Sequence, residues 1–126
     1  MNGPPVLWKA AEGRPETTAT PDSLAALLWP LVAEEWQEVF LLVCLDAQCR
    51  PLVVAEIARG AMTYCVVDQR VLFRAALAHG AHQIAVAHNH PSGEPAPSVE
   101  DRKIADRLVL AGALLGIEVV DSLVLA

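Results

Sequence analysis

The apolar segment from Val39 to Leu45 places the strongest constraint on how this chain can fold. Its seven residues carry no charge, and this length and composition are typical of a strand that is buried on both faces. The segment is also the longest apolar run, and it is far shorter than the roughly 20 residues that cross a bilayer. We therefore predict a central strand from Glu38 to Leu45 and no membrane span.

Strands and helices alternate along the rest of the chain. The other predicted strands are Leu52 to Ile57, Ala61 to Val67, Gln83 to Ala87 and Val119 to Leu125. Predicted helices begin at Pro21, with Thr20 as cap, at Arg70 and at Ser98. Pro30 should kink the first helix or end it early, and glycines 80 and 116 should end the other two. This alternation predicts an α/β domain of two or three layers.

The 126 residues suffice for one domain with its own hydrophobic core. Residues 1–19 are rich in proline, glycine and threonine, which predicts a flexible lead-in before a domain at 20–126. The sequence does not begin with basic residues followed by an apolar stretch. We therefore expect no signal peptide and a cytoplasmic location.

Charge and cysteine content argue against two classes of protein. Nine basic and fifteen acidic residues give a net charge of −6 with no basic cluster, so nucleic acid is not expected as the main partner. Cys44, Cys49 and Cys65 are odd in number and widely placed, which argues against a disulfide scaffold. We expect them to be free thiols in packing or surface positions.

His88 and His90 lie two residues apart at the end of a predicted strand. Side chains at this spacing point to the same face of a strand, so both imidazoles can share one metal ion, at about 2.0–2.1 Å each for zinc. Polar residues at a strand end show the same spacing, and the pair alone leaves both interpretations open.

Asp101 favours the metal site. The helix that begins at Ser98 is predicted to bury Ile104, Ala105, Leu108, Ala111 and Leu115. Asp101 lies three and four positions before the first two of these, so its carboxylate belongs to the buried stripe, where it needs a partner or a metal. Ser98 and Asp101 also form a helix-capping pattern, a structural role that is compatible with metal binding. Two histidines and one carboxylate make a catalytic zinc set with one open position.

A hydrolase that uses a metal-activated water also needs a general base. Glu38 is a candidate because it precedes an apolar strand, where a carboxylate either caps the sheet or acts at the site. By spacing alone, Glu34, Glu35 and Glu56 compete with it. Chemistry alone gives Glu38 and Glu56 equal claim.

The stretch from Ala87 to Asp101 resembles the signature of the RadC-like branch of the JAB/MPN (JAMM) zinc metalloproteases. That pattern is His-x-His, seven residues, Ser, two residues, Asp, which His88, His90, Ser98 and Asp101 match. The similarity extends over residues 20–125, and Glu38-Val39-Phe40 resembles the first core strand of the family. The resemblance implies a single JAB/MPN-like α/β domain whose mixed central sheet is flanked by helices, with layering like that of cytidine deaminases.

The activity that the resemblance implies is that of a zinc metallopeptidase. One Zn²⁺ would be held by His88, His90 and Asp101, Glu38 rather than Glu56 would be the general acid/base, and Ser98 would donate a hydrogen bond to the oxyanion. The substrate would be a peptide or protein with an amide or isopeptide bond.

The sequence departs from the family pattern at several places. Leu41 stands where the family has glycine, and Asp121-Ser122 replaces its Asp-His pair. Family members continue past the last strand and often carry a helix-hairpin-helix segment before the domain. This sequence shows neither, so it is expected to hold the catalytic module alone.

Other functions were weighed against the hydrolase. A catalytically silent JAB/MPN interaction module would keep the fold, but the motif residues and Glu38 are all present, which favours an enzyme. A DNA-repair-associated role, which the RadC name suggests, is disfavoured by the acidic charge. The His-Asn-His triplet is not an HNH nuclease motif, whose letters come from separated positions. A zinc deaminase would need His-x-Glu and Pro-Cys-x-x-Cys, and neither occurs.

Overall fold

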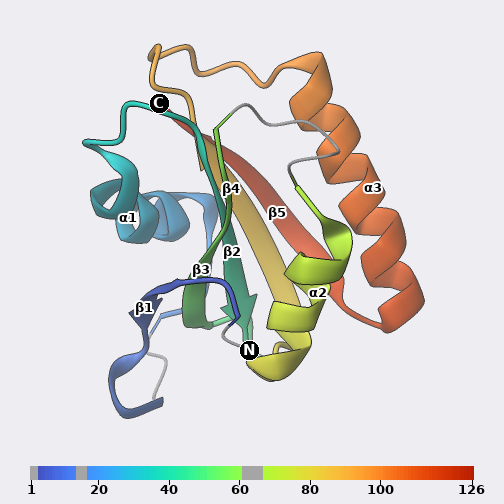
Figure 1. Cartoon of the computed structure of the whole chain (residues 1–126). Coiled ribbons are helices and arrows are strands. Elements are labelled where there is room, and N and C mark those ends of the chain that lie inside the picture. Colours follow the sequence, from blue (N-terminus) through green and yellow to red (C-terminus); the bar gives the residue numbers. More distant parts are fainter. Residues whose placement is uncertain (1–2, 14–16, 61–66) are drawn as a thin grey trace.

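A five-stranded mixed sheet with the strand order β1-β3-β2-β4-β5 forms the centre of the computed structural model, which describes residues 3–13, 17–60 and 67–126 (Figure 1). Three α-helices flank it in the described residues, which gives the small α/β domain that the resemblance to JAB/MPN domains implies. The elements are β1 (Val6–Lys9), the 3-10 helix η1 (Ala11–Gly13), α1 (Pro21–Val32), β2 (Val39–Leu45), β3 (Pro51–Arg59), α2 (Gln69–Ala78), β4 (Gln83–Asn89), α3 (Val99–Leu115) and β5 (Glu118–Leu125).

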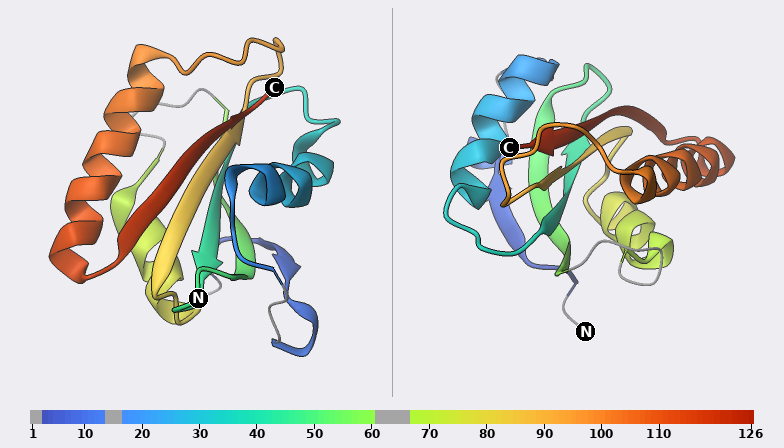
Figure 2. Two further views of the ribbon diagram at one scale, coloured as in Figure 1. Left: turned by 180° about the vertical axis from the view of Figure 1, so that it is seen from behind. Right: turned by 90° about the horizontal axis from the view of Figure 1, so that it is seen from above.

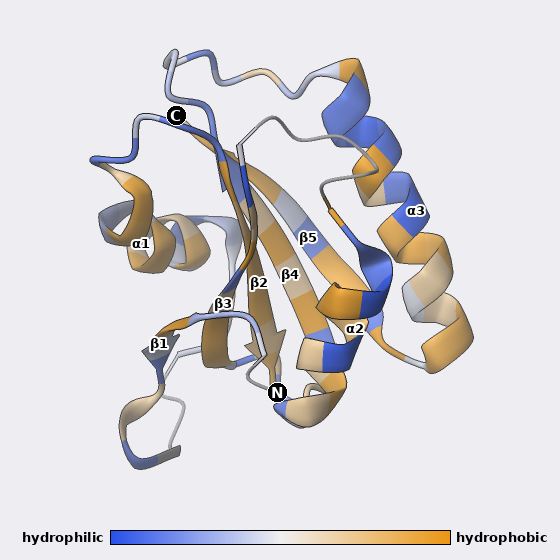
Figure 3. Ribbon diagram, viewed as in Figure 1, coloured by the Kyte–Doolittle hydropathy of each residue, from blue (hydrophilic) through white to orange (hydrophobic). Residues whose placement is uncertain are grey.

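The predicted central strand is confirmed, because all seven residues of β2 are buried. β2 pairs antiparallel with β3 and β4, and β4 pairs parallel with β5. The strands of the sheet are mostly hydrophobic, while the helices mix hydrophobic and hydrophilic residues (Figure 3). None of the helices in the described parts of the chain is long and apolar enough to cross a membrane.

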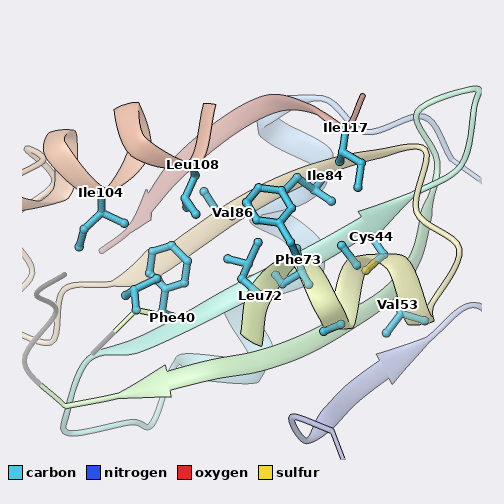
Figure 4. Packing of buried hydrophobic residues seen from close by; sticks show 14 residues of the cluster. Phe40, Cys44, Val53, Leu72, Phe73, Ile84, Val86, Ile104, Leu108 and Ile117 are labelled. Atoms are coloured by element: carbon cyan, nitrogen blue, oxygen red, sulfur yellow. The ribbon is translucent and has the colours of Figure 1, made fainter. Parts of the chain in front are cut away.

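Two hydrophobic cores lie on opposite faces of the sheet and make it a three-layer domain (Figure 2). α1 covers one face, where Leu24 and Leu28 pack with Leu41 of β2. α2 and α3 cover the other, where Phe73 and Leu108 belong to the cluster around β2 and β4 (Figure 4). Alternate residues of β2 feed the two cores because successive strand side chains point to opposite faces.

The helix boundaries follow the predicted caps, with one exception. The Thr20 hydroxyl accepts a hydrogen bond from the backbone N–H of Ser23, and Gly116 ends α3 in the left-handed conformation at φ 73°. Pro30 is expected to kink or end α1, and the helix continues two residues past it to Val32. Proline removes one hydrogen bond, and the burial of Val32 in the α1-side core stabilises the last turn in spite of that loss.

The segment predicted as a lead-in, residues 1–19, contains a strand at Val6–Lys9. These residues form β1, which pairs antiparallel with β3. Ala10 continues the pairing, because its N–H donates to the carbonyl of Leu52 at 2.9 Å. An edge strand of this kind depends on the partner that β3 offers and not on local composition, which the prolines dominate here.

Two further predictions concern single elements. The predicted strand Ala61 to Val67 falls, except for Val67, outside the described residues. On α3, Ile104 and Leu108 are buried as expected, but Leu115 is 50% exposed and Gly112 takes the inward position instead.

Gly112 allows α3 to approach the chain that follows it. A Cβ atom at this position would collide with the backbone oxygen of Ile117, and the Gly112 carbonyl accepts the N–H of Ile117 at 2.8 Å. Gly112→Ala should lower the free energy of unfolding by about 1–3 kcal/mol, although alanine favours helix by about 1 kcal/mol. Urea denaturation would measure this, with the exposed Ala113→Gly as a control for propensity alone. A stabilised Gly112→Ala variant would contradict the close contact.

Candidate metal centre

The end of β4 carries both histidines to one face of the sheet. His88 is 3% exposed and lies opposite Phe40 of β2, on whose ring its imidazole stacks with centroids 6.1 Å apart. His90 follows the strand, and its N–H donates to the carbonyl of Leu125 at 2.8 Å, which continues the extended path. The two Nε2 atoms lie 3.0 Å apart, as the strand periodicity predicts.

Asp101 reaches the same point from the first turn of α3. One carboxylate oxygen, Oδ1, lies 3.1 Å from Nε2 of His88, and Oδ2 lies 3.1 Å from Nε2 of His90. The Asp101 side chain is only 7% exposed. The prediction that Asp101 lies on the buried face of its helix is therefore correct.

The helix cap and the site use the same residues. The backbone N–H of Ser98 donates to Oδ2 of Asp101 at 2.7 Å, and the N–H of Asp101 donates to the Ser98 hydroxyl at 3.0 Å. Both alternatives weighed for this Ser-x-x-Asp pattern are thus compatible in one geometry. The cap fixes the carboxylate in front of the histidines, so the sequence that starts the helix also positions a ligand.

The hydrogen bond to Nδ1 of His90 determines where the proton of this imidazole lies. Nδ1 of His90 lies 2.8 Å from the Glu94 carbonyl, which only accepts hydrogen bonds, so Nδ1 carries the proton. In the neutral imidazole this leaves a lone pair on Nε2, which faces a carboxylate oxygen and a second imidazole nitrogen. Converging lone pairs of this kind are stabilised by a shared proton or by a cation between them, and an N–H bond to a carbonyl is the usual way to orient a metal-binding histidine.

The surroundings of His88 and Asp101 favour the protonation states in which these side chains can bind a metal. Burial lowers the pKa of His88 and outweighs the opposing charge of Asp101, so the imidazole tends to be neutral. Burial alone would raise the pKa of Asp101, but the hydrogen bond from the Ser98 backbone holds it below its ordinary value. A neutral imidazole and an ionised carboxylate are the ligand forms that a metal requires.

The distances also fit a metal ion. One atom from each of His88, His90 and Asp101 lies within 4.8 Å of the others, and the closest contacts are 3.0–3.1 Å. Ligands about 2.0–2.1 Å from a tetrahedral ion are separated by roughly 3.3 Å. These three buried side chains could therefore hold a metal ion.

Asn89, between the two histidines, points to the other side of the sheet and is 3% exposed. Its Oδ1 accepts the N–H of Val39 at 2.6 Å, and its Nδ2 donates to the carbonyl of Gln37 at 3.1 Å. These two backbone groups lie on either side of Glu38. A buried amide between two histidines that face the other side of the sheet must find its hydrogen-bond partners on the opposite face.

Glu38 is held next to the site through its backbone. Its carbonyl accepts the N–H of Gly60 at 2.8 Å, in addition to the contacts that Asn89 makes on both sides of it. The Glu38 carboxylate is near enough to His88 for its negative charge to favour protonation of the imidazole, against the larger effect of burial.

The competing acids belong to another part of the molecule. Glu56 lies opposite Leu41 in the β2–β3 register, which places it on the face that α1 covers and not on the face of the histidines. Arg59 binds Glu56 at 2.6 Å and Glu35 at 2.8 Å, and Glu34 is exposed. The geometry thus separates Glu38 from the acids that spacing could not distinguish from it.

Comparison with known proteins matches the model of the RadC-like JAB domain to residues 18–126. The chain belongs to the RadC-like JAB family. The match includes Glu38 and all four motif residues, so the site described above lies inside the RadC-like JAB domain.

Curated relatives agree with this family. The UPF0758 protein STH371 of Symbiobacterium thermophilum is 40% identical over 115 residues, which are 91% of this chain and 49% of the relative. UPF0758 protein Mbar_A2303 of Methanosarcina barkeri is 33% identical over 106 residues, 84% of this chain and 46% of its own. UPF0758 protein TTE0897 of Caldanaerobacter subterraneus subsp. tengcongensis is 33% identical over 119 residues, which are 94% of this chain and 51% of the relative. The RadC-like JAB chain described here thus spans about half the length of these relatives.

Proposed function

We propose that this domain is a zinc-dependent metallohydrolase that cleaves peptide or isopeptide bonds. The observation that carries the proposal is the convergence of His88, His90 and Asp101, whose ligand atoms lie within 4.8 Å of one another in a largely buried site. Two imidazoles and one carboxylate are a donor set of catalytic zinc sites, which leave one coordination position for water. When bound there, zinc lowers the pKa of water towards neutrality and so supplies the nucleophile.

Residues of the chain would handle the protons and the developing charge. Glu38 is the acid/base, since it is the carboxylate tethered beside the histidines and is not one of the three ligands. It would accept the proton of the attacking water and return it to the leaving amine. The Ser98 hydroxyl accepts a hydrogen bond from Asp101 and can still donate its own proton to the oxyanion.

The silent interaction module and the DNA-repair role remain second candidates. The family name hints at an association with DNA, but no contact or charge feature of the described residues favours nucleic acid over a polypeptide. The converging ligands and the tethered glutamate are features that an inactive module would not need.

Hydrolysis is tested by comparing the zinc-loaded protein with the same protein after chelation. Each would be incubated with a proteome-derived peptide mixture and with a ubiquitin-like isopeptide conjugate, and new amino termini and released chains would be quantified by mass spectrometry. We expect cleavage only by the zinc-loaded sample and its recovery when zinc is restored. Products that form equally after chelation, or no product from either substrate class, would refute the proposed activity.

A further inference from the structure

The outer edge of β5 is open and lies beside the metal centre. β5 pairs with β4 on one side, and no other described strand lies on the other (Figure 1). The Leu125 carbonyl accepts the N–H of His90, so the backbone groups of Leu125 point towards β4. Because successive residues of a strand direct these groups to opposite edges, Ser122 and Val124 direct theirs outwards.

A cleft of about 300 Å³ joins this edge to the candidate site. Ser122 and Val124 line the cleft together with two of the proposed ligands, His88 and Asp101. A chain that lies along the outer edge of β5 is therefore next to the place where its amide would react.

The outward groups of the edge are only partly satisfied by the protein itself. The Asp121 side chain accepts the N–H of Ser122 at 2.8 Å, which confirms that this N–H does not take part in the β4–β5 ladder. Within the described chain, the Ser122 carbonyl and both backbone groups of Val124 remain for a partner. A side chain that occupies one outward backbone group in this way limits indiscriminate strand pairing at the edge, while the remaining backbone groups stay available.

Charge in the cleft points to the class of partner. Arg102 is the only basic residue that lines it, directly after the ligand Asp101. The Arg102 side chain is exposed, and the structure records no ion pair for it among the described residues. In a chain of net charge −6, an unpaired guanidinium at this point selects for a carboxylate.

We propose that an extended acidic segment of the substrate adds to β5 as a further strand and places its amide in the cleft beside His88 and Asp101. The inference rests on the proposed hydrolase function and narrows its substrate class. Main-chain hydrogen bonds to Val124 supply the binding, and Arg102 pairs with an acidic side chain.

Binding is tested with the zinc-loaded Glu38→Gln protein, which would not consume the probe. The probe is a fluorescein-labelled ten-residue peptide of alternating glutamate and valine, and fluorescence anisotropy measures its affinity. We expect it to bind at least about tenfold more tightly than the version with lysine in place of glutamate. N-methylation of its central backbone nitrogens should abolish binding. Arg102→Ala should remove the preference for the acidic peptide. The neighbouring Lys103 is exposed and its Nζ lies 3.8 Å from Glu100, so Lys103→Ala should retain that preference.

Each outcome decides one of the two proposals. Unchanged affinity of the N-methylated peptide, or a dimer in sedimentation that the peptide does not dissociate, overturns strand addition at β5. If the Glu38→Gln protein binds as expected but the parent cleaves no peptide, the hydrolase function fails and the binding edge stands. If the parent cleaves peptides and Arg102→Ala leaves the ratio of kcat/KM for acidic and basic peptides unchanged, the edge fails and the hydrolase stands.

Discussion

Glu38→Gln is expected to lower the rate of amide hydrolysis by about 10²–10⁴-fold while the zinc content of the protein stays the same. Glutamine has nearly the same size, and it leaves the Gly60 bond to its own carbonyl and the Asn89 bonds to Gln37 and Val39 in place, but it cannot accept the proton of the attacking water. Glu38 is also not among the three candidate ligands. Steady-state kcat/KM and elemental analysis of the same preparation measure the two quantities.

Glu56→Gln is the matched control, since it makes the same chemical change on the face that α1 covers. Its bond to Arg59 is partly exposed, and loss of such a pair costs about 1 kcal/mol or less. We expect this variant to retain both zinc and activity. Equal rates for the parent and Glu38→Gln would show that another group is the base.

The double variant His88→Ala, His90→Ala is expected to lose about one zinc per chain together with all hydrolysis. It removes both imidazole nitrogens from a three-ligand set, and one carboxylate cannot hold the ion alone. Metal content after expression in zinc-containing medium measures the loss. A parent protein that purifies free of zinc under these conditions would refute the assignment of the metal.

The chain supplies its own control for this variant. It has four histidines, and the other two, His79 and His82, lie in the connection between α2 and β4. The double variant His79→Ala, His82→Ala should keep its zinc. Because His88 is buried against Phe40, its loss also leaves a cavity, and thermal unfolding must accompany the measurement. Asp101→Asn separates the effects, since it keeps the size of the side chain and removes the charge.

Local periodicity was sufficient to predict most of the metal centre. The strand period places His88 and His90 on one face, and the helix period places Asp101 on the buried side of α3; the structure confirms both. Glu38 was different, because its proximity depends on the pairing of β2 with β4, a contact between residues about fifty positions apart. No local pattern contains that register: chemistry alone left Glu38 and Glu56 equivalent, and only the family resemblance favoured Glu38.

The elements that the sequence did not predict depend on their partners. β1 forms because the edge of β3 is available to it, and the turn of α3 at Gly112 faces inward because the chain returns beneath it at Ile117. Pro30 stays inside α1 because the core holds the last turn. In each case the stabilisation from tertiary packing outweighs the local secondary-structure propensity of the residues.

The side chain of Asn89 couples the candidate metal ligands to the proposed acid/base. Asn89, which separates the two histidines, also forms hydrogen bonds with the backbone immediately before and after Glu38. Occupation of the centre by metal would therefore restrict the beginning of β2 as well as the end of β4. The peptide groups of Gln37 and Val39, to which Asn89 is hydrogen-bonded, are thus natural places for a spectroscopic reporter of metal loading.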